Sequence, residues 1–317
     1  MFIIPPRSVG DSELISTNIP FQYPTENVLE YDNTATYSQG DEVYLLSTKR
    51  IYECVIAVGD TVTGVSPETD VEKWMERDPL NQWAPFDKRL GTYSKGGEDF
   101  TWNGDIKQGI YFEVNLSDVV DSLSFFGILG KKLYVKVTDP VEGVVYETEV
   151  DLVDQEGIYD WLTYFFDPID YRVEYNLYDL PLYGNTTISI AIEKFDGQDI
   201  AQLSQVVLGR REDIGCTRFG LRFGIEDFSR KGRDSFGRPL LIERPFNKNA
   251  AFDVNLDNSR IDRVARLLQR YRAEPVVWVI LDEFESTTIY GNYRDFSIIL
   301  PNINISTCQI EIQGLDQ

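Results

Sequence analysis

The chain has 317 residues, of which 42% are hydrophobic and 13% aromatic, so it can bury a substantial core in two or three domains. Its net charge of -22 argues against nucleic acid or an anionic membrane surface as a partner of the whole molecule. Histidine is absent, which removes the usual general base, the usual activator of a serine or cysteine nucleophile and the commonest zinc ligand.

Residues 1–36 are predicted to form an extended N-terminal arm. Prolines interrupt its scattered apolar residues at Pro5, Pro6, Pro20 and Pro24. Proline breaks both helices and the hydrogen-bond ladders of strands, so this segment cannot form a core of its own. We expect the arm to lie over this subunit or over a neighbouring one.

Residues 37–90 are predicted to form a small all-β module. An alternating run begins after Gly40, the dipeptide Lys49-Arg50 marks a hairpin tip, and residues 51–58 supply a second strand. Alternation on both sides of a short turn is typical of an antiparallel hairpin.

Two tryptophans follow in a polar, turn-rich stretch of the module. Indoles in such a place either fill a small core or form a stacking platform for a flat ligand, and the sequence leaves both interpretations open. A module of this size needs large apolar side chains for its own core, which favours the first interpretation for at least one of the two. Under the second interpretation the residues predicted to form the platform are Trp74, Trp83, Tyr52 and Tyr44.

Residues 91–105 are rich in glycine, serine, aspartate and threonine and are predicted to be a linker. From residue 106 to residue 208, short runs of β-branched and aromatic residues recur between turn clusters. This spacing predicts an antiparallel β-sandwich.

Residues 209–317 are predicted to form an α+β domain that carries a basic band. Residues 209–272 contain 15 of the 30 lysines and arginines against nine acidic residues, so this band is about +6 and the remainder of the chain about -28. Local ion pairs within the band would explain the arginines; alternatively, the band binds an acidic surface, for example that of a second copy in a ring. The predicted interface residues are Arg210, Arg211, Arg218, Arg222, Arg263, Arg266 and Arg270.

The sequence predicts one helix, from Asn258 to Ala273. Asn258 or Ser259 is expected to cap it, and its apolar residues lie on a single stripe. Pro275 ends the helix, and an apolar strand follows. The whole chain is therefore predicted to be mainly β with a small α+β part.

The sequence holds no catalytic motif that we recognise, and we expect a protein that is not an enzyme. It has no phosphate-binding Gly-Lys-Ser/Thr loop and no nucleophile elbow. Cys54, Cys216 and Cys308 have neither metal-ligand spacing nor a disulfide framework, so no metal and no cofactor is predicted. No run of about 18 apolar residues occurs, which argues against membrane insertion.

The module carries the pattern Tyr37-x-x-Gly40-Asp41-x-Val43, followed by Tyr52, Pro67 and Trp74. This pattern resembles the chitin-binding type of carbohydrate-binding module found on chitinases and cellulases and also in tailed bacteriophages. The resemblance implies a compact three-stranded module whose exposed aromatic residues stack on sugar rings, and the carbohydrate-binding residues that it implies are Trp74, Trp83, Tyr52 and Tyr44. The phage form is similar over a longer span, which includes PPRSVGDSELISTNIPF before the module and Asn81-x-Trp83-x-x-Phe86-Asp87 after it.

The remainder resembles minor tail proteins of the same phages, from SFFGILGKKLYVKV through GIEDFSRKGRDSFG to YGNYRDFSI and QIEIQGL. The resemblance implies a structural protein of the phage tail, located in the virion after synthesis in the host cytoplasm, at the tail tip, baseplate or fibre-attachment region. Its implied partners are other tail proteins and further copies of itself. The alternative is an adhesin subunit that contacts a host cell-surface glycan directly.

Overall fold

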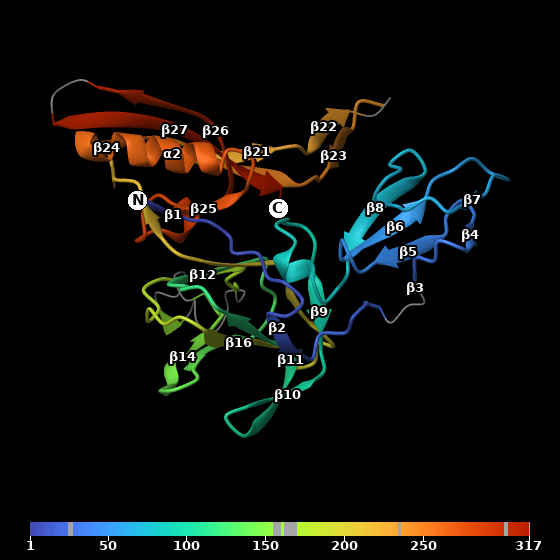
Figure 1. The fold of residues 1–317 in the computed structure, drawn as a ribbon. Coiled ribbons are helices and arrows are strands. Elements are labelled where there is room, and N and C mark those ends of the chain that lie inside the picture. Colours follow the sequence, from blue (N-terminus) through green and yellow to red (C-terminus); the bar gives the residue numbers. More distant parts are fainter. Residues whose placement is uncertain (25–27, 155–159, 162–169, 234–235, 301–303, 317) are drawn as a thin grey trace.

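The computed structural model describes residues 1–24, 28–154, 160–161, 170–233, 236–300 and 304–316. Figure 1 shows three parts: a small β module, a β-sandwich, and a C-terminal sheet covered by a helix. Most strands pair antiparallel, and α2 lies in the C-terminal part, so the predicted fold class is confirmed.

The module is a four-stranded sheet in the order β3-β5-β6-β8, with a separate pair β4-β7. Its core contains Val43, Tyr52 and Trp74. The predicted hairpin at Lys49 is confirmed, but the sheet has one strand more than expected, because β3 adds to β5 in parallel. The strands are β3 (Leu29–Glu30), β4 (Thr36–Tyr37), β5 (Glu42–Leu45), β6 (Arg50–Cys54), β7 (Val62–Thr63) and β8 (Trp74–Pro79).

The segment predicted as an extended arm lies over its own subunit and joins two of the larger sheets. β1 (Phe2–Ile4) pairs with β19 and β25 of the C-terminal sheet, and β2 (Leu14–Thr17) pairs with β11 of the sandwich. β1 ends directly before Pro5, so a proline limits its length, whereas β2 ends at Thr17, ahead of Pro20.

The sandwich shares one core between two sheets. The larger sheet has the order β10-β11-β16-β13-β14, and it faces the sheet β15-β12-β18. β9 and β17 form a further pair. The bounds are β9 (Ser94–Gly96), β10 (Asp99–Trp102), β11 (Asp105–Leu116), β12 (Ser122–Phe126), β13 (Lys132–Asp139), β14 (Gly143–Asp151), β15 (Glu174–Leu177), β16 (Thr186–Glu193), β17 (Ala201–Leu203) and β18 (Gln205–Gly209), with a 3-10 turn η1 (Ala84–Phe86).

The segment 91–105, predicted to be a linker, instead contributes β9 and β10 to the sandwich. Its polar composition is misleading, because Phe100 and Trp102 alternate with polar residues and are buried. Gly97 is needed for close approach of two backbones: a Cβ atom there would lie 2.0 Å from the Asp199 carbonyl oxygen.

The C-terminal sheet has the order β19-β1-β25-β26-β27-β24-β20, and β21 pairs with the first half of β24. Its elements are β19 (Glu212–Asp213), β20 (Cys216–Thr217), β21 (Arg222–Asp227), β22 (Arg230–Arg233), β23 (Pro239–Ile242), β24 (Phe246–Asp257), η2 (Asn258–Arg260), α2 (Ile261–Arg270), β25 (Val276–Val279), η3 (Glu285–Thr287), β26 (Thr288–Ile299) and β27 (Ile305–Asp316).

The helix α2 packs Val264, Leu267 and Leu268 into the core of this sheet. The predicted helix is therefore confirmed in its position, but the predicted cap is wrong. Arg260 occupies the N-cap position of α2 and no side chain caps the helix, because Asn258 and Ser259 both lie in the preceding 3-10 turn.

The C-terminal sheet and the sandwich pack on each other through a small apolar cluster that includes Ile4, Val207 and Val277. Phe126 of the sandwich stacks on Tyr290 with the ring centres 5.4 Å apart. Because the N-terminal strand β1 takes part in this cluster, the two ends of the chain are held in one packed body.

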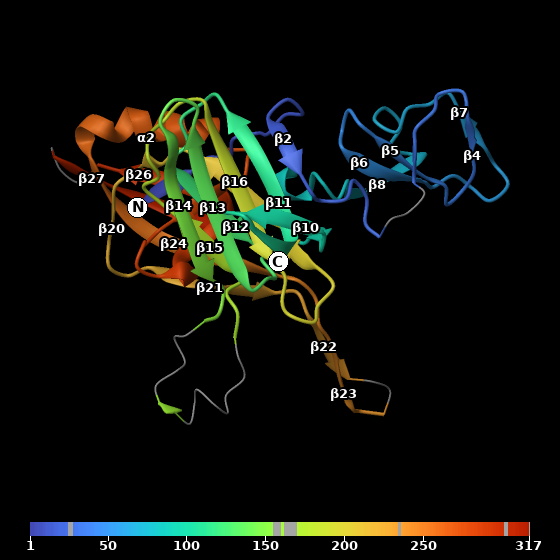
Figure 2. The same cartoon turned by 90° about the horizontal axis from the view of Figure 1, so that it is seen from below.

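β22 and β23 form a two-stranded hairpin that extends away from this body, as Figure 2 shows. It continues the β21–β24 pair, since Asp227 is the register partner of Phe246 and Arg230 that of Ile242. We call residues 228–245 the projecting hairpin.

Candidate functional site

Two of the four residues of the predicted carbohydrate platform, Trp74 and Tyr52, fill the core of the module. Trp74 is only 2% exposed, and its Nε1 atom donates a hydrogen bond to the Val65 carbonyl oxygen at 3.1 Å. Tyr31 and Tyr37 pack edge-on against its ring. The indole of Trp74 therefore has no open face for a sugar.

Trp83 lies in a different core from Trp74. It is 8% exposed and belongs to the sandwich core, where it packs against Phe86. Trp74 begins the strand β8, and Trp83 follows its end. An extended strand advances about 3.3 Å per residue, so β8 holds the two indoles apart. The two tryptophans therefore fill separate cores, as the core interpretation expects of at least one of them, and they do not form a shared stacking platform.

Tyr44 is half-buried at the seam between the module and the sandwich. Its ring packs edge-on against Phe21 at 5.3 Å between ring centres. The four predicted platform residues thus serve two separate cores and the seam between them, and the structure does not assemble them into one binding surface.

A cleft at this same seam holds two tyrosines that the sequence analysis did not select. The cleft has a volume of about 410 Å³, and its walls include Tyr23, Tyr93, Arg77 and Asp78. Tyr23 is 42% exposed and Tyr93 is 40% exposed, so both rings are accessible. Lys95 Nζ lies 5.7 Å from the centre of the Tyr23 ring. The two tyrosines were overlooked because they come from segments predicted to be an arm and a linker.

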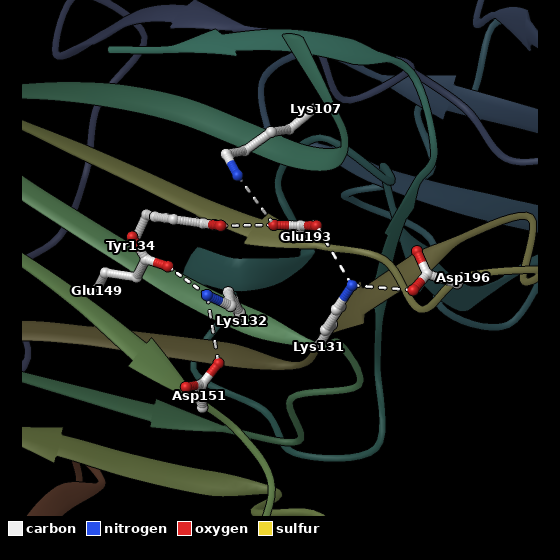
Figure 3. A network of polar contacts seen from close by, with 8 residues as sticks. All are labelled: Lys107, Lys131, Lys132, Tyr134, Glu149, Asp151, Glu193 and Asp196. Carbon is white, nitrogen blue, oxygen red and sulfur yellow. Dashed lines mark hydrogen bonds and ion pairs between the residues drawn. The ribbon is translucent and has the colours of Figure 1, made fainter. Parts of the chain in front are cut away.

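The outer face of the larger sandwich sheet carries a network of charged side chains, shown in Figure 3. The hydroxyl of Tyr134 donates a hydrogen bond to Glu193, and Lys107 Nζ lies 3.3 Å from the same carboxylate. Burial and the Glu193 carboxylate raise the pKa of Tyr134, which keeps the phenol protonated. Lys132 pairs with Glu149 and Asp151 on the neighbouring strand.

Lysines and carboxylates therefore face each other across the strands of this face. Opposite charges in such cross-strand positions stabilise a solvated sheet. We assign the network a structural role.

The arginines predicted to form an interface come from several elements, and some are used within the chain. Arg211 pairs with Asp179 and lies over the Phe2 ring. Arg263 on α2 pairs with Glu212 at 2.8 Å.

Arg218 lies 3.8 Å from Asp253. The remaining predicted interface residues are exposed on the loop after β18, on β21 and on α2: Arg210, Arg222, Arg266 and Arg270. Both the local pairing and the exposed charge that the sequence allowed are thus present, and Arg218 and Arg263 are paired and exposed at once.

The segment that includes the projecting hairpin exposes large apolar side chains, which the sequence did not reveal. Residues 219–242 interleave basic side chains with large apolar ones, and most of the apolar ones are exposed to solvent, whereas Leu221 packs against the C-terminal core. The exposed large hydrophobic residues of this segment are Phe219, Phe223, Ile225, Phe228, Phe236, Leu240, Leu241 and Ile242. Their interleaving with arginine and glycine was visible in the sequence, but its exposure was not, because the same pattern fits a half-buried strand.

Across the described part of the chain, no cluster of three or more cysteines and carboxylates is arranged to hold a metal ion. No helix in these residues is long and apolar enough to cross a bilayer. Comparison with known proteins found no matching family model, no matching curated protein and no matching solved structure.

Proposed function

We propose that this chain is a structural, non-enzymatic component of a bacteriophage tail, at the tail tip, baseplate or fibre-attachment region, and that the projecting hairpin is one of its assembly contacts. The single observation that supports an assembly role best is this hairpin, whose large apolar side chains are exposed on a segment that extends from the body.

The physical argument starts from the weakness of such a hairpin. A two-stranded ribbon is at best marginally stable in water, and every residue of β22 and β23 is exposed. Contiguous exposed apolar surface of this kind marks an interaction site in a soluble protein. A partner that covers Leu240, Leu241 and Ile242 would remove this surface from water and order the ribbon.

The phage context rests on the resemblance of the sequence motifs. The N-terminal arm, the module pattern around Gly40 and the Asn81-x-Trp83 motif occur in the order found in minor tail proteins. The burial of Trp74 and Trp83 favours assembly over direct sugar binding at these residues.

Deletion of the projecting hairpin tests the proposal. Asp227 and Phe246 are register partners, so an Asn-Gly turn between them closes the β21–β24 pair without residues 228–245. We expect the shortened protein to fold, and phage carrying the shortened gene to produce particles with incomplete tails. Complete, infectious particles would contradict the assembly role, and absence of the chain from purified wild-type particles would contradict the virion location.

The cleft at Tyr23 and Tyr93 supports a second candidate function, an adhesin subunit that binds a host cell-surface glycan. Two accessible aromatic rings beside charged side chains can stack on a sugar ring and bind its hydroxyl groups. Loss of binding on a glycan array for Tyr23→Ala and Tyr93→Ala, with wild-type thermal stability, would support this function. Absence of any glycan binding by the wild-type chain would exclude it for the glycans tested.

A further inference from the structure

The projecting hairpin is basic as well as apolar. Residues 228–245 contain five lysines and arginines against two acidic residues, a net charge of +3 in a chain whose net charge is -22. Lys231 and Arg233 are two residues apart on β22, so their side chains lie on the same face of that strand. Lys231 Nζ pairs with Asp227 of the same chain at 2.7 Å, and this ion pair is exposed, so the lysine can exchange it for a carboxylate of a partner.

A surface of opposite charge lies at the edge of the sandwich. β14 is the last strand of the larger sheet, and among the described residues it pairs with β13 alone. Its other edge therefore presents backbone N–H and C=O groups that can pair with a further strand. The side chains of Glu147, Glu149 and Asp151 are exposed on one face of it, where they also pair with Lys136 and Lys132 of β13.

The charges of the two hairpins are equal and opposite. The β13–β14 hairpin, residues 132–151, contains two lysines and five acidic residues, a net charge of -3. Its turn exposes Val141, which is 90% exposed, and the first residues of β14 expose Val144. The acceptor thus combines an open strand edge with acidic side chains that complement the basic side chains of β22, and it has exposed apolar side chains at its turn.

We propose that the projecting hairpin of one copy binds the β14 edge of a second copy. β22 adds to β14 as a further strand, and Lys231 and Arg233 lie opposite the carboxylates at 147, 149 and 151. β22 is the better strand for this contact, because β23 begins with Pro239, which lacks an N–H group. This inference rests on the proposed assembly function. That function does not identify the partner of the hairpin, and the inference identifies it as a second copy of the chain.

The geometry of the assembly follows from the two surfaces being different parts of the chain. A contact between unlike patches is heterologous, so each copy offers one hairpin and one edge to two neighbours. Such contacts close into a ring when the rotation between copies permits it, and otherwise extend into a filament. The pairing of charge fixes the register of the added strand.

A charge-reversal experiment tests the contact. The hairpin variant carries Lys231→Glu and Arg233→Glu, and the edge variant carries Glu147→Lys and Glu149→Lys. Self-association of the full chain is measured by mass photometry and sedimentation at low and high salt, and thermal unfolding confirms that each variant is folded. Arg266→Glu with Arg270→Glu on α2 is the matched control, since it reverses the same number of charges away from the contact.

We expect the wild-type chain and the α2 control to self-associate and to loosen at high salt. We expect each contact variant alone to have a self-dissociation constant raised about tenfold or more. A mixture of the two contact variants should restore both hairpin-to-edge contacts between unlike chains, so it should assemble with the two variants alternating.

Two results would overturn the inference: a wild-type chain that stays monomeric at every concentration tested, or folded contact variants that associate like the wild type. If the wild type is monomeric but phage without the hairpin still lack complete tails, the hairpin binds another tail protein and the proposed function stands. If the chain self-associates through this contact but is absent from particles, the contact between copies stands and the proposed function in the phage tail fails.

Discussion

The ammonium group of Lys49 lies 3.2 Å from the centre of the Trp83 ring. Lys49 is at the tip of the β5–β6 hairpin of the module, whereas Trp83 is in the sandwich core. The same ammonium group pairs with Asp11 of the N-terminal arm at 2.7 Å. One lysine therefore connects the module, the arm and the body of the molecule.

Replacement of Lys49 should loosen the module from the body. Lys49→Ala removes the cation–π contact and the ion pair but keeps a Cβ atom at the same positive φ of 60°, so backbone strain is unchanged. We expect a loss of about 0.5–2 kcal/mol in the contact and faster hydrogen exchange around Trp83. Lys73→Ala, at an ion pair within the module, is the control. Unchanged exchange around Trp83 would contradict the role of Lys49.

Trp74→Ala should unfold the module, because the indole of Trp74 fills the module core and has no open face for a ligand. Removal of a buried tryptophan costs about 3–5 kcal/mol, and here it also leaves the Val65 carbonyl oxygen without its hydrogen bond. Limited proteolysis should cut the module of the variant while the sandwich stays intact. Tyr93→Ala, at an accessible ring, should leave the proteolysis pattern unchanged. A folded Trp74→Ala variant would contradict the core assignment.

Gly209→Ala should displace the N-terminal strand from the body. A Cβ atom at Gly209 would lie 2.3 Å from the Pro5 carbonyl oxygen and 2.7 Å from Ile4 Cγ2, so β1 must shift. We expect a loss of about 1–3 kcal/mol in the free energy of unfolding, measured by denaturant titration. Gly224→Ala is the matched control, because no atom lies within 4 Å of its Cβ position. Equal stability of both variants would show that the arm is not held at this point.

The three thiols should react at very different rates. Burial raises the pKa of the Cys308 thiol to about 11, with the Asp253 carboxylate adding to the shift, and burial also raises the pKa of Cys54. A raised pKa lowers the thiolate fraction near pH 8, and the thiolate is the reactive form. Cys216 is exposed. Titration with a thiol reagent should therefore find one fast thiol per native chain and three in denaturant. Two fast thiols in the native chain would contradict the burial of Cys54 or Cys308.

The elements that sequence reasoning located are those with a long, regular pattern. The helix at Val264 and the strands of the sandwich carry several apolar residues at a fixed period. A regular period of this kind predicts both the type and the position of an element. The two-residue strand at Leu29 and the short strand at Ser94 have no period to detect. Their pairing depends on partners far away in the chain, which composition does not reveal.

The candidate surfaces were harder to predict for a related reason. Trp74 and Trp83 are close in sequence, but β8 carries them into different cores, and proximity along the chain suggested a shared platform. The arginines of the basic band were recognisable by charge alone, yet whether each is paired, as Arg263 is, depends on tertiary contacts. The projecting hairpin was included in that band, but its exposed leucines looked like ordinary strand residues.

Covalent cross-linking between two differently marked copies tests the hairpin-to-edge contact most directly. One variant carries Lys231→Cys and the other Glu149→Cys, both with Cys216→Ser to remove the exposed native thiol. A short bismaleimide is added to the mixture, and the linked peptides are identified by mass spectrometry. The contact predicts a cross-link between position 231 of one copy and position 149 of the other, which high salt suppresses. Folded variants that yield no such link at low salt would contradict it.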